Sequence, residues 1–202
     1  MVARMTHAQE PSSAPVPAGD YRLDPAHASL IFKVSHLGFS MYTARFTDFD
    51  ARLYFDPRQL EAAKLQARVD ARSLETDFPN PKQLDFNAQL QGEEWLATEK
   101  HPQIRFVSTD VKMTGDREMQ VTGDFTLRGV TRPLTLNVRY NGGYAGHEID
   151  PNARVGFSAT GTVKRADYGM DFGLPPAGSN MGVGNDVQVI IEAEFTGPPL
   201  PQ

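Results

Sequence analysis

Apolar and polar residues alternate along most of this chain, with the two-residue period of a β-strand that buries one face. In the stretch SLIFKVSHLG, Leu30, Phe32, Val34 and His36 share one phase, while Lys33 lies on the other. We expect such a strand to turn the first set inward. Similar segments recur at 45–55, 64–74, 103–111, 119–129, 133–140, 154–165 and 186–195, so eight strands are predicted.

The connections between these segments favour antiparallel neighbours. In the second segment the phase changes between Phe46 and Phe49, which predicts a bulge of the kind a curved barrel strand needs. Turn-forming residues lie at 115–116, 129–133 and 141–143. The turn at 129–133 separates two apolar-phased strands and predicts a hairpin loop.

Only residues 79–99 break the alternation. Phe86 and Leu90 are four residues apart, as are Gln91 and Trp95, so one or two short helices covering one end are predicted. Antiparallel strands with one polar face each form a sandwich or a closed barrel. An eight-stranded barrel is either filled by its own side chains or just wide enough for one slender ligand.

The pattern predicts one folded domain over residues 20–196. Residues 1–19 are expected to be a flexible lead-in, because 12–19 are rich in Pro, Ala and Ser. Thr6-His7-Ala8 could be the end of a signal-peptide cleavage region whose front is missing. Residues 197–202 are expected to be a C-terminal tail.

Composition narrows the function classes. The chain has 202 residues, a net charge of -5 and no cysteine, which excludes disulfides, thiol catalysis and the usual structural zinc sites. Lys and Arg are spread along the chain instead of forming a stripe, which argues against nucleic acid and against an anionic membrane surface as partner. No apolar run approaches the ~18 residues of a membrane span.

Five strings, in order and over nearly the whole domain, carry a resemblance to a known family. They are YRLDPAHASLIFKVSHLGFS (21–40), EEWLATEKHPQIRFVST (93–109), GDFTLRGVTRPLTLNV (123–138), VGFSATGTVKRADYGM (155–170) and GNDVQVIIEAEF (184–195). On these strings the chain resembles the YceI-like family. The resemblance implies an all-β, eight-stranded antiparallel lipocalin-like barrel with an elongated apolar channel.

The resemblance also implies a ligand and a compartment. The channel would take up a long polyisoprenoid chain, such as a quinone tail or a polyprenyl compound, in a periplasmic protein for which catalysis is not established. The chain departs from the family pattern at Ala28, at Ala44 and over residues 85–91, where DFNAQLQ replaces a charged stretch. The environment of the ligand's head group therefore cannot be carried over.

Strand phase and the resemblance together give a set of candidate ligand-binding residues. His36 ends the inward phase of its strand, and either hydrogen bonds hold it in place or it contacts a polar head group. Residues 169–186 form a long connection that is either a gate or an irregular surface loop, with aromatic and Met side chains alternating just before it. The candidates are Phe32, Val34, His36, Phe46, Phe49, Leu53, Ile104, Phe106, Leu127, Leu136, Phe157, Tyr168, Met170 and Phe172.

The leading hypothesis is a carrier, reservoir or scavenger of one isoprenoid lipid, with no metal and no catalytic cofactor. At roughly 0.3 kcal/mol per heavy atom, a tail of about forty carbons gives about 12 kcal/mol, enough for nanomolar binding. The alternative is an enzyme acting on an isoprenoid or quinone head group, using His36 with Arg165 or Tyr168. The expected partner is the lipid itself. Transient membrane contact, and a homodimer formed through helices or loops, are further expectations.

Overall fold

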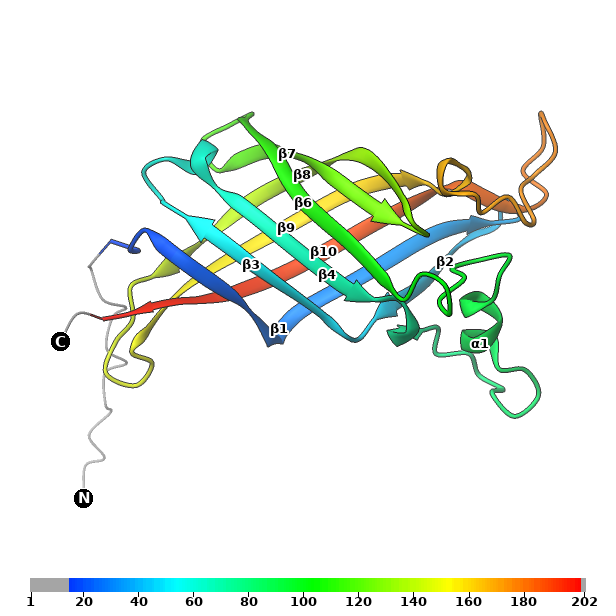
Figure 1. The fold of residues 1–202 in the computed structure, drawn as a ribbon, viewed down its shortest axis with the longest axis horizontal. Coiled ribbons are helices and arrows are strands. Elements are labelled where there is room, and N and C mark those ends of the chain that lie inside the picture. The colour runs from blue at the N-terminus through cyan, green and yellow to red at the C-terminus, as the bar shows by residue number, and fades with distance from the viewer. Residues whose placement is uncertain (1–14, 201–202) are drawn as a thin grey trace, which may run out of the picture.

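The alternating segments become the strands of one antiparallel sheet that closes on itself, as the computed structural model of the protein shows (Figure 1). The structure describes residues 15–200, so most of the predicted lead-in and its cleavage region lie outside the described residues. The sheet closes because β10 pairs with β9 on one side and with β1 on the other. The strands are β1 (Gly19–His36), β2 (Ser40–Phe46), β3 (Phe49–Phe55), β4 (Lys64–Asp70), β5 (Leu74–Glu75), β6 (Gln103–Met113), β7 (Glu118–Leu127), β8 (Val130–Tyr144), β9 (Asn152–Lys164) and β10 (Val183–Pro199).

Strands β2 and β3 share one position in the barrel wall. β2 pairs with the second half of β1, whereas β3 pairs with residues 19–22 at its start. β1 has a register shift against β10 between Leu23 and Ala28. Two separate strands, β2 and β3, therefore pair with the two halves of β1. With β2 and β3 taken together and β5 as a two-residue addition to β2, eight strands surround the axis. The predicted eight-stranded antiparallel barrel is confirmed.

Three local predictions need correction. β8 runs through the turn predicted at 141–143, and the chain connects to the next strand over residues 145–151 instead. A break at residues 47–48 replaces the bulge predicted between Phe46 and Phe49, because Ser73 accepts hydrogen bonds from the N–H groups there, as in the 3.1 Å bond from Thr47 to the Ser73 carbonyl. The hairpin loop predicted at 129–133 is only two residues long. Arg128 (φ 51°) and Gly129 (φ 74°) both adopt the left-handed conformation that such a tight turn requires, so β8 starts at Val130.

Within residues 15–200 the α-helix α1 (Phe86–Gln91) lies at the right-hand end of the barrel in Figure 1, the same end as the connection between β9 and β10. Asp85 caps it by accepting a 2.9 Å hydrogen bond from the Ala88 N–H, and Gly92 ends it. Three short 3₁₀ helices lie at Leu60–Ala62, Ala71–Ser73 and Arg165–Tyr168. Among the described residues, no helix has the length and apolar character to cross a membrane.

The opposite end, where β1 begins and β10 finishes, is filled by an aromatic cluster of Tyr21, Phe55, Tyr140, Phe157 and Phe195. Tyr21 and Phe55 are each 1% exposed, and their ring centroids are 6.1 Å apart with the rings edge to face. Burial raises the pKa of Tyr21 to about 12. We call this the packed end of the barrel and the end near α1 the open end.

β10 continues three residues past the boundary predicted at 196, because Pro199 pairs with Asn152. Gly197 passes directly over the ring of Tyr21. A Cβ atom at this position would lie 2.1 Å from Tyr21 Cε1, so glycine is required for the close approach. The end of β10 is therefore part of the packed end and not a separate tail.

Candidate ligand-binding cavity

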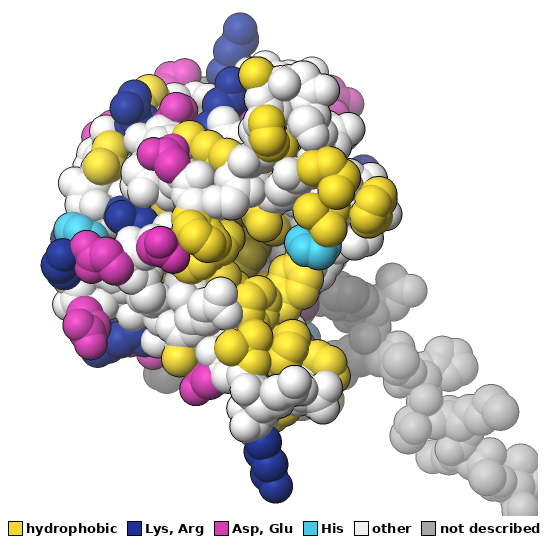
Figure 2. All heavy atoms as spheres, turned by 90° about the vertical axis from the view of Figure 1, so that its right-hand side faces the viewer, with side chains coloured by type: hydrophobic (Ala, Val, Ile, Leu, Met, Phe, Trp, Pro, Cys, Tyr) yellow, Lys and Arg dark blue, Asp and Glu magenta, His cyan; other side chains and the backbone are white. Residues whose placement is uncertain are grey.

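The barrel encloses a cavity of about 300 Å³, at the lower end of the range for small-molecule sites. Its wall is built by inward residues of nine of the strands, and all but four of the lining residues are apolar. Leu90 of α1 and the residues Trp95 and Leu96 that follow it complete the wall at the open end. Figure 2 looks into this end, where hydrophobic side chains surround a hollow.

The buried side chains do not form one continuous core. They fall into three clusters, one at the packed end around Tyr21 and Phe55, one around Phe106 and Leu136, and one around Tyr168 and Met170. Several inward aromatic residues, such as Phe46, are only partly buried because they face the cavity. The interior is therefore hollow, as an elongated ligand requires.

The wall residues predicted from strand phase all line this cavity. Their contact with a ligand stays a prediction, but their common orientation follows from the two-residue period of the strands. They are Phe32, Val34, Phe46, Phe49, Leu53, Ile104, Phe106, Leu127, Leu136 and Phe157. Met170, predicted as part of a gate, lines the cavity as well.

His36 does not face the cavity. Its side chain is exposed and is not part of the lining, so the inward orientation predicted for it is wrong. The pairing of β1 with β10 shifts between Val34 and His36, and Leu37 (φ 54°) begins a turn immediately afterwards. The alternation of faces that holds up to Val34 therefore fails at the last residue of the strand.

Tyr168 and Phe172 also lie off the cavity wall. Tyr168 is buried against Phe125, with ring centroids 5.5 Å apart, and packs outside the lining. Phe172 is 48% exposed and packs edge to face on Trp95. Of the three residues named for the enzyme alternative, only Arg165 lines the cavity.

Arg165 is a buried cation in this otherwise apolar wall and is only 2% exposed. Its guanidinium donates to three carbonyl oxygens: from Nε to Gly184 (2.8 Å), from Nη1 to Met170 (2.6 Å) and from Nη2 to Val183 (2.8 Å). Burial lowers its pKa. The guanidinium carbon also lies 5.3 Å from the centre of the Trp95 ring, within the range of a cation–π contact.

Sequence reasoning missed Trp95 as a site residue and named Arg165 only for catalysis. The four-residue spacing from Gln91 predicts a helix face for Trp95, but α1 ends at Gln91 and the Trp95 ring turns to the cavity. One signal was available, because Trp95 is the only tryptophan in the chain and lies in a string that carries the family resemblance. The contacts of Arg165 reach 18 and 19 residues along the chain, beyond any local pattern.

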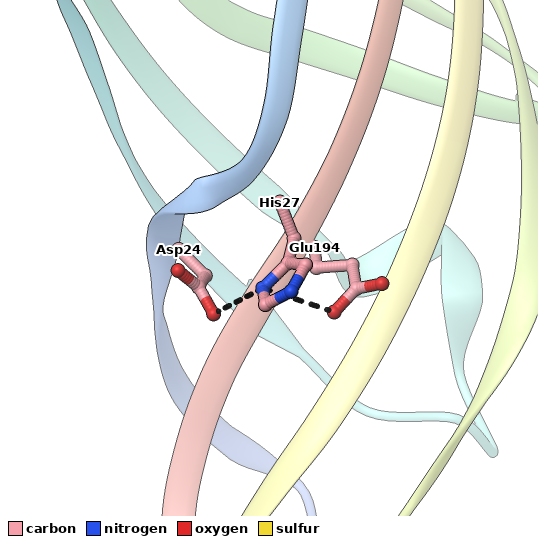
Figure 3. A group of neighbouring side chains, drawn as sticks. All are labelled: Asp24, His27 and Glu194. Atoms are coloured by element: carbon pink, nitrogen blue, oxygen red, sulfur yellow. Dashed lines mark hydrogen bonds and ion pairs between the residues drawn. The ribbon is translucent and has the colours of Figure 1, made fainter.

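A charged cluster on the barrel surface has residue types that could ligate a metal ion. Asp24, His27 and Glu194 place one ligand atom each within 4.8 Å of one another (Figure 3). However, Arg154 donates to Asp24 and lies 4.0 Å from Glu194, so its positive charge already occupies the place of a cation. The hydrogen bond from His27, followed by that from Arg154, lowers the pKa of Asp24 to about 2. The cluster is an ion-pair network that ties the bend of β1 to β9 and β10.

Comparison with known proteins agrees with this architecture. The family profile described as the YceI-like domain matches residues 21–195. The protein YceI of Escherichia coli O157:H7 is 35% identical over 179 residues, which cover 88% of this chain and 86% of that protein. The crystal structure of BcnA from Burkholderia cenocepacia has a TM-score of 0.71 at 21% identity and covers 85% of this chain and 98% of its own. A polyisoprenoid binding domain from Saccharophagus degradans has a TM-score of 0.60 at 15% identity, over 90% of this chain and all of that one.

Proposed function

Since the chain belongs to the YceI-like family, we propose that it binds one long-chain polyisoprenoid lipid inside the barrel, as a carrier, reservoir or scavenger. The observation that carries this proposal is the continuous apolar lining of the cavity. A fold neighbour is described as a polyisoprenoid binding domain, which favours the same ligand class. A branched prenyl chain is long, flexible and apolar, and it matches a narrow wall of Phe, Leu, Ile and Val side chains.

The binding energy is expected to come from the tail. Burying a methylene group contributes about 0.8 kcal/mol, so even partial burial of a prenyl chain offsets the cost of ordering it. A quinone-type or polyprenyl ligand would satisfy this requirement equally well. The tail therefore provides most of the affinity, and selectivity between head groups depends on the residues at the open end.

We further propose transient contact with a membrane surface through the open end. Three apolar side chains there are strongly exposed: Phe39 (80%), Met181 (59%) and Phe172 (48%). Phe39 lies in the turn after β1, and the other two lie in the connection between β9 and β10, which reaches the same end in Figure 1. An apolar rim around the mouth of a lipid cavity would let a prenyl chain pass from a bilayer without crossing water.

The proposed compartment is the periplasm, as the family resemblance implies. Fractionation of cells that express the full-length gene tests this directly. Recovery of the protein with the cytoplasmic fraction would overturn it, whereas release by osmotic shock would support it.

Solvent extraction of the purified protein followed by mass spectrometry tests the ligand. We expect a prenyl compound in the extract, or uptake of one by delipidated protein. Failure to load any prenyl compound would overturn the proposed function. Competition between the prenyl compound and an unrelated apolar dye separates a carrier from a scavenger. A scavenger should bind the two with similar affinity, whereas a carrier should prefer the prenyl compound.

A further inference from the structure

The open end of the cavity contains hydrogen-bond donors that lack acceptors. The Trp95 side chain lines the cavity, and its Nε1 atom is shielded from solvent without a hydrogen-bond partner among the described residues. An indole N–H only donates, so it needs an acceptor oxygen from another molecule. Buried donors without partners are rare in folded proteins and call for an explanation.

Arg165 adds further donors at the same place. A guanidinium has five N–H groups, and three of them donate to the carbonyl oxygens of Met170, Val183 and Gly184. Within residues 15–200, no carboxylate lies within ion-pair distance of Arg165. The groups in direct contact with the guanidinium are neutral carbonyl oxygens and the face of Trp95, and the more distant Asp171 carboxylate also favours its charged form. Two N–H groups of the guanidinium remain without a partner in this part of the chain.

The other polar residues of the lining already have partners. Asp50 and Arg68 pair with each other at 3.6 Å, and both side chains are largely exposed. Ser108 Oγ accepts a 2.8 Å hydrogen bond from the Leu65 N–H. Among residues 15–200, Trp95 Nε1 is the one buried side-chain nitrogen or oxygen atom without any hydrogen-bond partner, and it belongs to the ring that contacts Arg165.

We propose that Trp95 and Arg165 form a head-group site for an acceptor oxygen, a carbonyl or phosphate oxygen at the end of the prenyl chain. This inference rests on the proposed function and orients the ligand within it. The head lies at the open end against Trp95 and Arg165, and the chain runs toward the packed end. A hydrogen bond in which one partner is charged is stronger than a neutral one, so Arg165 favours an oxygen that carries negative charge.

The contacts around Trp95 position it for this role. Its ring contacts both the Arg165 guanidinium and the ring of Phe172, whose centroid is 5.5 Å away. Its carbonyl accepts a hydrogen bond from Arg128, in the turn between β7 and β8. Backbone and ring are therefore both held by neighbouring elements, which fixes the direction of the N–H group.

The test compares three probes of matched chain length: squalene, a prenyl quinone and a prenyl phosphate. Delipidated full-length protein labelled with ¹⁵N gives one indole N–H resonance, because the chain has one tryptophan. We expect the two oxygen-bearing probes to bind about tenfold more tightly than squalene and to move this resonance downfield. Squalene should leave the resonance near its unliganded position.

A variant isolates the N–H group. Trp95→Phe keeps an aromatic ring beside Arg165 and removes the N–H donor together with part of the indole ring. Because Trp95 lines the cavity, the variant should weaken all probes somewhat, but it should weaken the two oxygen-bearing probes several-fold more than squalene. Phe125→Leu, which removes an aromatic lining residue with no polar atom, is the matched control and should weaken all three probes alike. Circular dichroism checks that both variants fold, and the resonance of the unsubstituted protein needs no variant.

The outcomes separate the two proposals. Tight binding of squalene at the level of the oxygen-bearing probes, with an unmoved indole resonance, would overturn the head-group site and leave isoprenoid binding intact. Binding of none of the probes would overturn both. A preference shared by quinone and phosphate supports the site as stated, and the tighter of the two identifies the class of head group that it takes.

Discussion

The two ends of the barrel are built by the same alternating strands and have opposite properties. At the packed end, aromatic rings meet edge to face, and Tyr21, Phe55 and Val155 are almost fully buried. At the open end, Phe39 is 80% exposed, and the buried polar group Trp95 Nε1 has no partner among the described residues. The packed end stabilises the fold, and the open end leaves hydrogen-bonding capacity and apolar surface available to a ligand.

The largest expected effect follows from removing a ring at the packed end. Phe55 contacts three other rings, with centroid distances of 5.2 Å to Tyr140, 5.5 Å to Phe157 and 6.1 Å to Tyr21. Phe55→Ala should lower the free energy of unfolding by about 3–5 kcal/mol, measured by urea denaturation. Phe172→Ala, the same change at the open end, should cost less than about 1 kcal/mol. Equal losses would erase the distinction between the ends.

Filling the middle of the cavity tests whether a long prenyl ligand extends from the open end toward the packed end. Ala159 lines the cavity on β9, and its neighbour Thr160 is exposed on the outer face. Ala159→Phe should weaken binding of a long prenyl ligand about 100-fold, equivalent to about 2.7 kcal/mol, because the ring obstructs the channel. Thr160→Phe adds the same ring outside and should leave affinity unchanged. Titration calorimetry measures both, and unaltered binding to Ala159→Phe would exclude a ligand that spans the middle of the barrel.

The close approach of β10 to Tyr21 gives a smaller effect on stability. Gly197→Ala places a methyl group where the ring of Tyr21 lies, so the ring or the strand must shift. We expect a loss of about 1–3 kcal/mol, measured by urea denaturation, as is usual for overpacked sites. Gly178→Ala is the control in the open-end connection, where a Cβ meets nothing within 4 Å but the backbone has φ 76°. Gly178→Ala should cost about 1 kcal/mol, from backbone strain alone. If Gly178→Ala destabilised the protein as much as Gly197→Ala or more, the packing argument for Gly197 would be contradicted.

The surface network beside the bend of β1 predicts a dependence on pH. The pKa of Asp24 is lowered from 3.8 to about 2 by the hydrogen bonds from His27 and then Arg154, so its stabilisation is present above pH 3.8 and is lost as the pH falls toward 2. This loss should be no more than about 2 kcal/mol. The hydrogen bond to Asp24 raises the pKa of His27 above its usual 6.5, so that contribution is complete below pH 6.5 and is lost at higher pH.

Urea denaturation of the unsubstituted protein and of Asp24→Asn at about pH 2.5, 5 and 8 checks this network. The lowest pH lies within the range over which Asp24 loses its stabilising effect, and the other two lie on either side of 6.5. The variant should lose part of the acid-dependent change and the change between pH 5 and 8 that His27 contributes. Asp110→Asn is the control, because Asp110 is exposed on β6 and forms no ion pair within the described part of the chain. Identical pH profiles for Asp24→Asn and the unsubstituted protein would show that the network is too weakly formed to matter.

The sequence predicted the cavity wall well because a two-residue period fixes which side chains share a face. Phase alone cannot say how far along the axis a residue lies, so it did not separate Phe55 at the packed end from Phe46 near the open end. It failed at His36, where a register shift ends the alternation, and it did not find the pair of Trp95 and Arg165. Those two residues are 70 positions apart and meet because the segments that carry them lie at the same end of the barrel, which no local pattern records.

The smallest effect on stability, and the clearest contrast between the ends, concerns two exposed apolar residues. Phe39 is 80% exposed at the open end, and Ile149 is 92% exposed in the connection between β8 and β9 at the packed end. Phe39→Ser and Ile149→Ser should each change the free energy of unfolding by less than about 0.5 kcal/mol. Only Phe39→Ser should reduce co-sedimentation with phosphatidylethanolamine and phosphatidylglycerol vesicles, because only the open end surrounds the mouth of the cavity. An equal reduction by both variants would mean that vesicle binding reflects general surface apolarity, and the open end would then lose its proposed role in lipid entry.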